Sequence, residues 1–150
     1  MIMLKRAYEP PAASDGARFL VERLWPRGIR KADLALDGWL KDVAPSPELR
    51  RWFGHDPRRW REFRRRYIRE LRRKAAALDP LLAAAREGPL TLVYSARDTE
   101  HNAAVALREH LSGRLRPTDP AASAEAAAVR RVPRRRRTSP EQTHPGYARQ

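Results

Sequence analysis

The hydrophobic positions in the first part of the chain form short runs of the kind found in β-strands. Residues 2–7 predict a first strand, and residues 18–25 predict a second strand with an apolar centre. The segment between them contains a pair of prolines and an Asp-Gly step, which predict a loop. The second strand should end at Pro26, which cannot donate a ladder hydrogen bond, and Gly28 permits a tight turn there.

From residue 33 onward, apolar residues recur mainly at helical spacing. This periodicity predicts helices at about 33–43, 46–53, 57–77, 78–86 and 100–115. Two of the predicted starts combine an N-cap side chain with proline at the first helical position, namely Ser46 with Pro47 and Asp56 with Pro57. We interpret the large aromatic side chains of this region as core rather than as platforms for stacked bases; they are Trp52, Trp60, Phe63 and Tyr67.

A third apolar run, at residues 90–95, follows a Gly-Pro step and predicts another strand. Strands separated by helical segments favour an α/β fold with a parallel sheet. Three strands are evident from the pattern, and a cryptic fourth strand remains open. The sequence therefore predicts a small, mainly parallel sheet covered by helices, formed by residues 1–116.

The composition changes at residue 117. Residues 117–150 are rich in Ala, Pro, Arg, Ser and Thr and contain no Leu, Ile, Phe or Trp. Such a segment buries too little apolar surface to offset its chain entropy, so we expect residues 117–150 to form a disordered tail.

Cysteine is absent, which excludes disulfides, thiolate nucleophiles and thiolate metal sites. No apolar run approaches the roughly 20 residues that a membrane span needs, and the first residues lack the apolar stretch of a signal peptide. We therefore expect a cytoplasmic protein without a membrane partner.

The net charge is +14, and much of it lies at residues 50–74, which contain eleven Arg and one Lys against three acidic residues. Such a field suggests nucleic acid as a partner. The arginines that would form this interface on the predicted helix are Arg58, Arg61, Arg65, Arg69 and Arg72, with the run at 134–137 in the tail. A second interpretation stays open, because a GC-rich genome produces the same bias toward Arg, Ala and Pro without selection for binding.

A cluster of polar, mostly titratable residues follows the strand at 90–95. In open α/β sheets, ligands bind outside the carboxyl ends of the strands. Asp98 and His101 could therefore place an acid and an imidazole in one pocket, and His55 is a third candidate for acid–base catalysis near neutral pH. The alternatives are that Asp98 caps the following helix and that His55 bonds loop backbone. Ser95 lacks the glycines of a nucleophile elbow, and the histidines lack the spacing of metal ligands, so neither a metal nor a cofactor is predicted.

Arg23 and Arg27 flank Trp25 at the end of the second predicted strand. Arginine grips phosphate or carboxylate with two parallel hydrogen bonds, and Gly28 would let an anion approach the backbone. The competing interpretation is that Arg23 pairs with a buried acid, such as Glu22 or Asp37, while Trp25 packs in the core. Further pocket candidates at the strand ends are Trp25, Tyr94, Ser95, Arg97 and Asn102.

Four separated motifs together resemble the YeaO-like family of small bacterial proteins, which is classed as a domain of unknown function. They are Leu-Val-Glu-Arg-Leu-Trp-Pro-Arg-Gly at 20–28, Trp-Leu-Lys-Asp-Val-Ala-Pro-Ser at 39–46, Leu-Arg-Arg-Trp-Phe-Gly-His-Asp-Pro at 49–57, and Leu-Val-Tyr-Ser-Ala-Arg-Asp at 92–98 with His-Asn at 101–102. The resemblance covers about residues 2–114 and implies a compact α/β fold, a cytoplasmic setting and no established activity. The family usually has Asp where this chain has Glu22. More distant relatives carry a Cys-His-Arg step where this chain has His101 and Asn102, so cysteine chemistry does not carry over.

Two functional hypotheses follow from the sequence. In the first, a pocket at the strand ends binds an anionic small molecule, with or without acid–base chemistry. In the second, the protein associates with nucleic acid through the arginine-rich helix and the tail. Neither the substrate nor the oligomeric state is readable from the sequence.

Overall fold

The computed structural model describes residues 1–116, and the predicted tail at 117–150 lies outside the described residues. Within residues 1–116 the strands form one sheet in the order β1-β4-β2-β3, and all three pairings are parallel. The strands are β1 (Ile2–Arg6), β2 (Ala17–Leu20), β3 (Gly38–Trp39) and β4 (Leu90–Tyr94). The parallel α/β architecture predicted from the sequence is confirmed, and β3 is the cryptic fourth strand.

The helices largely follow the predicted pattern. They are α1 (Lys31–Leu34), α2 (Pro47–Phe53), α3 (Trp60–Arg73), α4 (Asp79–Glu87) and α5 (Ala103–Leu115), with short 3-10 turns at Ala13–Asp15, Lys41–Val43, Pro57–Arg59 and Ala75–Leu78. The Ser46 hydroxyl accepts from the N–H of Leu49, and Gly54 ends α2 in the left-handed region, as its position after the apolar residues predicted. The carboxylate of Asp56 caps the turn before α3 by accepting from the N–H of Arg58.

The predicted helix at 33–43 is wrong. Its start forms only the short α1, which ends at Ala35 with a positive φ of 51°, and Gly38 and Trp39 then pair with Phe19 and Leu20 of β2. A Cβ atom at Gly38 would lie 2.8 Å from the Phe19 ring, so a larger residue there would require that ring to shift. Pairing with a distant strand therefore overrode the local helical spacing.

The second strand is also shorter than predicted, because β2 ends at Leu20. The N–H of Val21 still bonds the carbonyl of Val93, and beyond it the chain leaves the sheet as a loop. The residues from 22 to 27 are thereby free to form a wall at the carboxyl edge of the sheet rather than a continuous strand.

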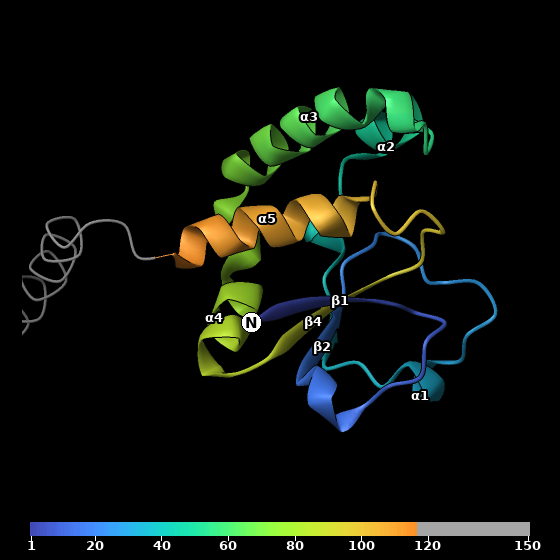
Figure 1. Cartoon of the computed structure of the whole chain (residues 1–150), viewed down its shortest axis with the longest axis vertical. Coiled ribbons are helices and arrows are strands. Elements are labelled where there is room, and N and C mark those ends of the chain that lie inside the picture. Colours follow the sequence, from blue (N-terminus) through green and yellow to red (C-terminus); the bar gives the residue numbers. More distant parts are fainter. Residues whose placement is uncertain (117–150) are drawn as a thin grey trace, which may run out of the picture. The chain divides into compact units, whose positions relative to one another are not determined.

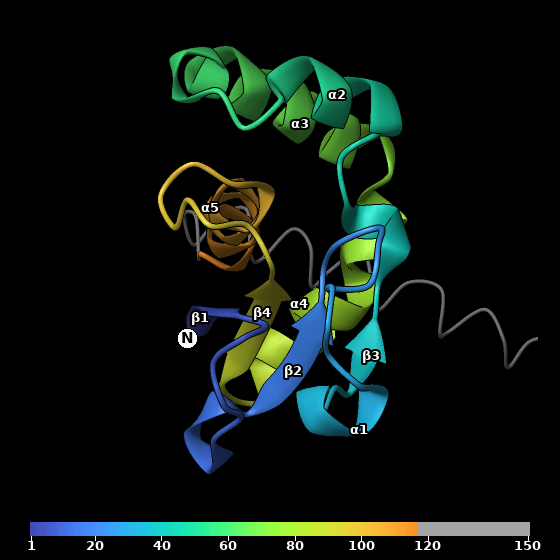
Figure 2. The ribbon, with the colours of Figure 1, turned by 90° about the vertical axis from the view of Figure 1, so that its right-hand side faces the viewer.

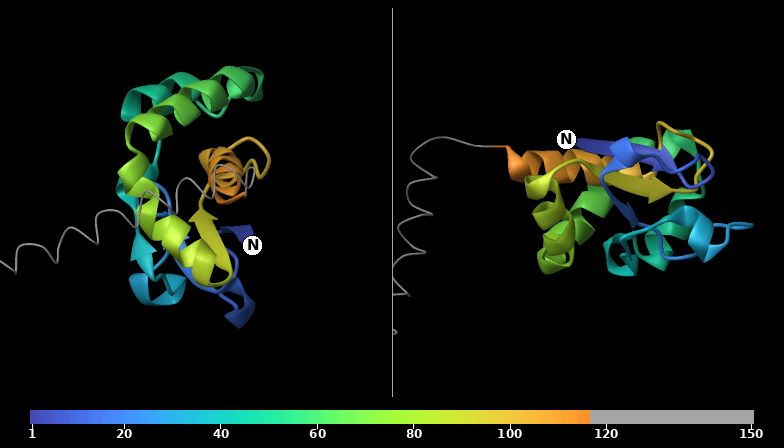
Figure 3. Two further views of the ribbon diagram at one scale, coloured as in Figure 1. Left: turned by 90° about the vertical axis from the view of Figure 1, so that its left-hand side faces the viewer. Right: turned by 90° about the horizontal axis from the view of Figure 1, so that it is seen from below.

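The main core lies on the sheet face that carries Leu90, Leu92 and Tyr94 of β4. In Figures 1 and 2, α5 lies between the strands and the pair formed by α2 and α3, and Figure 3 shows α4 leading into β4. Phe63 and Tyr67 of α3 are fully buried in this core, as predicted. The two tryptophans of this region, Trp52 and Trp60, are only half-buried at its edge.

The opposite face of the sheet carries a smaller apolar cluster and a buried ion pair. Leu20 and Val93 pack there with Leu34 of α1. Beside them Arg18 lies 2.7 Å from the carboxylate of Asp15, and Lys5 lies 3.0 Å from the same carboxylate. Burial acts to raise the pKa of Asp15, but the hydrogen bonds from the Ala12 N–H and from the two cations outweigh it and hold that pKa below its usual range.

Because the strands are parallel, their carboxyl ends meet at one edge of the sheet. The segments that leave β2 and β4 at this edge, residues 21–30 and 95–102, lie next to the start of α5 and the end of α2. This edge is where the candidate site is found.

Candidate functional site

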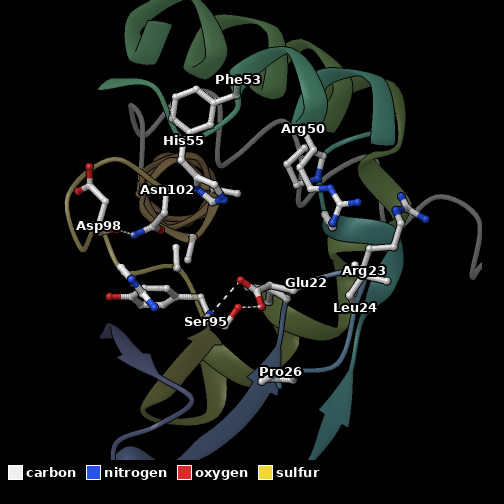
Figure 4. A pocket seen from close by; sticks show the side chains of 18 of the residues that line it. Glu22, Arg23, Leu24, Pro26, Arg50, Phe53, His55, Ser95, Asp98 and Asn102 are labelled. Carbon is white, nitrogen blue, oxygen red and sulfur yellow. Dashed lines mark hydrogen bonds between the residues drawn. The ribbon is translucent and has the colours of Figure 1, made fainter. Parts of the chain in front are cut away.

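A cavity of about 650 Å³ lies at the carboxyl ends of β2 and β4 (Figure 4). Its walls come from the segment after β2, the segment 44–55 with α2, the segment after β4, and the first turn of α5. Tyr8, after β1, and Phe63 of α3 complete the lining. Segments far apart in the sequence thus converge on one hollow at the sheet edge.

The Glu22 carboxylate is held in this cavity by Ser95. It accepts the backbone N–H of Ser95 at 2.9 Å and the Ser95 hydroxyl at 2.7 Å. The two bonds join the segment after β2 to the segment after β4, and Figure 4 shows them across the floor of the cavity. Arg6, at the end of β1, also holds the segment after β4 in position, because its guanidinium donates to the carbonyls of Ser95 and Ala96.

The Asp98 carboxylate also has hydrogen-bond partners within the chain. One oxygen accepts the backbone N–H groups of Glu100 and His101, and the other lies 3.0 Å from Nδ1 of His101. The hydrogen bond from the Glu100 N–H, with those from the side chain and backbone of His101, holds the pKa of Asp98 below its usual range. Asn102 donates to the Asp98 carbonyl and accepts from the N–H of Val105, so it caps α5.

The arginines that line the cavity are Arg23, Arg27, Arg50 and Arg97. None of the four makes an ion pair with a described carboxylate. The Nε atom of Arg23 is buried and has no hydrogen-bond partner among residues 1–116. The pairing of Arg23 with Glu22 or Asp37 is not observed, because Glu22 bonds Ser95 and Asp37 accepts from the backbone N–H of Arg18. A buried guanidinium N–H without a partner is unusual and costly.

The inner part of the cavity is apolar. Phe53 stacks on Phe63, with ring centroids 4.2 Å apart, and Val21, Tyr94 and Ala104 lie beside them. These five side chains are buried. Burial raises the pKa of the Tyr94 hydroxyl, so this phenol is neutral at physiological pH. The cavity therefore combines an apolar interior with a set of unpaired guanidinium groups.

Most of the residues proposed from the sequence line this cavity. They are Arg23, Trp25, Arg27, His55, Tyr94, Ser95, Arg97, Asp98 and Asn102. Trp25 also has a packing role, because its indole N–H donates to the carbonyl of Ile29 and its ring meets Trp39 edge-on at 5.3 Å. His55 is exposed at the rim and has a positive φ of 58°.

Two of the proposed residues are not among the lining residues. His101 instead packs edge-on against Trp60, with ring centroids 5.6 Å apart, and bonds Asp98. Gly28 forms a turn with φ of +75° and has no atom within 4 Å of the position where a Cβ would stand. The structure thus leaves His101 and Gly28 out of the residues that line the cavity.

Sequence reasoning missed Arg50 and Arg6. Arg50 lies one helical turn before Phe53 on α2, so the two side chains share a helix side and both reach the cavity. The spacing of three residues was a usable signal, but Arg50 was counted with the basic helix instead. Arg6 stands at the carboxyl end of a parallel strand, and this position alone marked it as a candidate.

The arginines of the alternative interface lie on the exposed side of α3 or just before it. Arg58 bonds the carboxylate of Asp56, and Arg65 lies 3.6 Å from that of Glu62. The other three side chains have no hydrogen-bond or ion-pair partner within the described part of the chain; they are Arg61, Arg69 and Arg72. The basic run at 134–137 lies outside the described residues.

A second, shallower hollow of about 440 Å³ lies between α2 and α3. Trp52 lines it, and the guanidinium groups of Arg59 and Arg66 lie 5.1 and 4.4 Å from the centre of the Trp52 ring system. Arg69 and Arg73 extend the basic side of this hollow.

In residues 1–116 no group of three or more His, Cys, Asp or Glu side chains is arranged to hold a metal ion. Within the same residues, no helix has the length and apolar character to cross a membrane.

Comparison with known proteins gives consistent matches. The family described as "Inactive DUF488-N3 subclade" matches residues 1–130. The uncharacterized protein YeaO of Escherichia coli is 46% identical over 110 residues, covering 73% of this chain and 96% of YeaO. The uncharacterized protein Rv3073c of Mycobacterium tuberculosis is 42% identical over 113 residues, covering 75% of this chain and 95% of Rv3073c. No solved structure matches.

Proposed function

The chain belongs to the inactive DUF488-N3 subclade, a YeaO-like family of unknown function, and we propose that its cavity binds an anionic small molecule. The observation that carries the proposal is the buried Nε of Arg23, which has no partner among the described residues. A ligand oxygen at this position would satisfy the donor and offset the cost of its desolvation.

The balance of charges around the cavity supports an anion rather than a cation. The carboxylates of Glu22 and Asp98 already accept hydrogen bonds from neighbouring residues. The guanidinium groups of Arg23, Arg27 and Arg50 have no carboxylate partner among residues 1–116. The charged lining side chains that have no hydrogen-bond or ion-pair partner in this range are therefore cationic.

Binding without turnover accounts for the cavity better than acid–base catalysis does. The imidazole of His101 packs on Trp60 and bonds Asp98, and it is not among the residues that line the cavity. The Ser95 hydroxyl donates to Glu22, a bond that ties two segments of the fold together. The description of the subclade as inactive agrees with this interpretation.

Calorimetric titration of the full chain with inorganic phosphate tests the proposal. Wild-type protein should bind phosphate, and Arg23→Met should lose most of this affinity. Arg61→Met, which removes an exposed charge from α3, should bind as wild type does. Equal binding by wild type and Arg23→Met would place the anion elsewhere and refute the proposal, as would a lack of any binding to wild type.

A second candidate function is association with single-stranded nucleic acid through the α2–α3 hollow. The observation that favours it is that the exposed Arg66, Arg69 and Arg73 line this hollow together with the half-buried Trp52, because arginines beside an aromatic ring suit a charged strand with stacked bases. The α3 aromatics Phe63 and Tyr67 are buried, so they do not contribute to such a surface.

Fluorescence anisotropy with a labelled single-stranded RNA tests this second candidate. The affinity should fall steeply with salt, and a variant with Gln at positions 66, 69 and 73 should show a weaker salt dependence. Arg23→Met should leave this binding unchanged. An absence of binding at about 0.15 M salt would eliminate the second candidate.

A further inference from the structure

We propose that the cavity at the ends of β2 and β4 takes an aromatic phosphate monoester, with the phosphate on the arginine side and the ring against the apolar interior. This inference rests on the proposed function and specifies its ligand. It follows from the size of the cavity, from the different sides on which Arg23 and Phe53 lie, and from the number of guanidinium groups.

The cavity is too large for an inorganic anion alone. Its volume of about 650 Å³ lies within the range of roughly 300–1,000 Å³ that is typical of sites for small organic molecules. A phosphate group held by arginines would leave most of this space empty. The remaining volume leaves room for an organic body attached to the anion.

The arginines and the aromatic rings lie on different sides. In Figure 4, Arg23 and Arg50 lie on one side of the cavity, whereas Phe53, with His55, Asn102 and Asp98, lies toward the other. The edges of the stacked Phe53 and Phe63 line the interior. A flat aromatic group gains both apolar burial and ring–ring contact at such a wall.

The number of arginines favours a doubly charged head group. One guanidinium can hold a carboxylate by two parallel bonds, so a single carboxylate would leave the others unused. Arg23, Arg27 and Arg50 come from the segment after β2 and from α2, and all three line the same cavity. A phosphate monoester offers three terminal oxygens and a charge near −2 above about pH 7, which matches several donors at once.

The carboxylates limit the ligand to one such head group. Glu22 lies on the floor and Asp98 on the side away from Arg23, as Figure 4 shows. A polyanion extending across the cavity would bring its second charge near one of these carboxylates, which is unfavourable. A single anionic head with an uncharged aromatic body avoids this repulsion.

The test compares four probes by calorimetric titration of the full chain at about pH 8, where phosphate monoesters are dianions. The probes are methyl phosphate, 1-naphthyl phosphate, 1-naphthoate and inorganic phosphate. 1-Naphthyl phosphate should bind at least roughly tenfold more tightly than methyl phosphate, because its rings are removed from water. It should also bind more tightly than 1-naphthoate, which has one charge less.

A variant that fills the apolar part separates the body from the head. Ala103 lines the cavity from the first turn of α5 and is half-buried, so Ala103→Leu narrows the interior without touching an arginine. The affinity of Ala103→Leu for 1-naphthyl phosphate should fall to the level of methyl phosphate, while its affinity for inorganic phosphate stays as in wild type. An unchanged thermal melting temperature of the variant verifies that its fold is intact.

The outcomes distinguish this inference from the proposed function. If inorganic phosphate binds through Arg23 but the naphthyl group adds nothing, the aromatic ligand is refuted and the anion site stands. If 1-naphthoate binds as tightly as 1-naphthyl phosphate, the doubly charged head is refuted. If none of the probes binds to wild type, both the inference and the proposed function fail.

Discussion

The carboxylate of Glu22 accepts two hydrogen bonds from Ser95, one from its backbone N–H at 2.9 Å and one from its hydroxyl at 2.7 Å. Glu22 follows β2 and Ser95 follows β4, and these strands are neighbours in the sheet. The contact therefore closes the carboxyl edge of the sheet at the floor of the cavity. It also keeps a carboxylate at a fixed place in a cavity that four arginines line.

We expect the pair to contribute measurably to stability. Ser95→Ala removes one charge-assisted hydrogen bond and should lower the free energy of unfolding by about 1–2 kcal/mol in urea denaturation. In a double-mutant cycle with Glu22→Ala, the coupling between the two side chains should be roughly 1 kcal/mol. Strictly additive effects of the two substitutions would contradict a direct interaction between the hydroxyl and the carboxylate.

Glu22 should stabilise the fold but weaken the binding of an anion. Glu22→Gln keeps the size of the side chain but removes the negative charge, so it should bind phosphate more tightly than wild type does. The measurement is the same calorimetric titration, with the dissociation constants compared at equal ionic strength. Weaker phosphate binding by the variant would indicate that Glu22 itself contacts the ligand as an acceptor.

Arg23 is expected to lower stability in the absence of ligand. Its buried Nε has no partner among residues 1–116, and an apolar side chain of similar length avoids this desolvation. The unliganded Arg23→Met protein should therefore have a melting temperature equal to or above that of wild type, while its phosphate binding is lost. A clear decrease in melting temperature would show that Arg23 is a structural residue with a partner in solution.

Two glycines should respond oppositely to substitution by alanine. Gly16 has φ of +66°, and a Cβ there would lie 2.2 Å from the carbonyl oxygen of Pro89. Gly16→Ala should therefore cost at least about 3 kcal/mol of unfolding free energy. Gly113 lies in α5 with open space around its Cβ position, so Gly113→Ala should stabilise by about 0.5–1 kcal/mol. The unfolding free energies of both variants are measured by chemical denaturation. An unchanged unfolding free energy for Gly16→Ala would contradict the close approach of Gly16 to Pro89.

We expect the folded protein to lose stability at mildly acidic pH because of the titration of His110. Burial, together with the nearby Arg114 and Arg72, lowers the pKa of His110 below its usual value near 6.5, and its Nε2 has no partner in the described chain. Above about pH 6.5 the imidazole is neutral in both the folded and unfolded states, so it has no effect. As the pH falls below this value, the unfolded chain binds the proton first, and the free energy of unfolding decreases until the lowered folded pKa is reached.

Urea denaturation between about pH 8 and pH 5 measures this effect. His110→Gln cannot titrate, so its stability should decrease less than that of wild type over the acidic part of this range. Parallel curves for the two proteins, differing only by a constant offset, would show that the pKa of His110 is the same in both states.

Local chemistry made much of the fold predictable. The Ser46 cap with Pro47, and Gly54 after the last turn, marked α2 because capping acts within a few residues. The strand at Leu90–Tyr94 was evident because a central parallel strand is buried on both faces and reads as an apolar run. The helix predicted at 33–43 failed because pairing of Gly38 with Phe19, a non-local contact, decided the structure there.

The candidate site was predictable only in part. Parallel strands indicated that Arg23, Ser95 and Asp98 would come to one edge, since strand direction alone sets where strands end. The spacing of Arg50 and Phe53 placed both on one side of α2, but the sequence could not show that this side would face the cavity or that His101 would turn toward Trp60. Both depend on how α2, α3 and α5 pack on one another, and helix packing is set by side chains far apart in the sequence.

The sequence by itself determined the α/β class, the helix caps and the family, because periodicity, capping and motif order are properties of short segments. The tertiary structure alone decided which charges are paired and which remain free. Glu22 bonds Ser95, which lies 73 residues further along the chain, whereas the buried Nε of Arg23 has no hydrogen-bond partner within residues 1–116. Pairing of buried charges depends on distance in space, and only the packed chain fixes that distance.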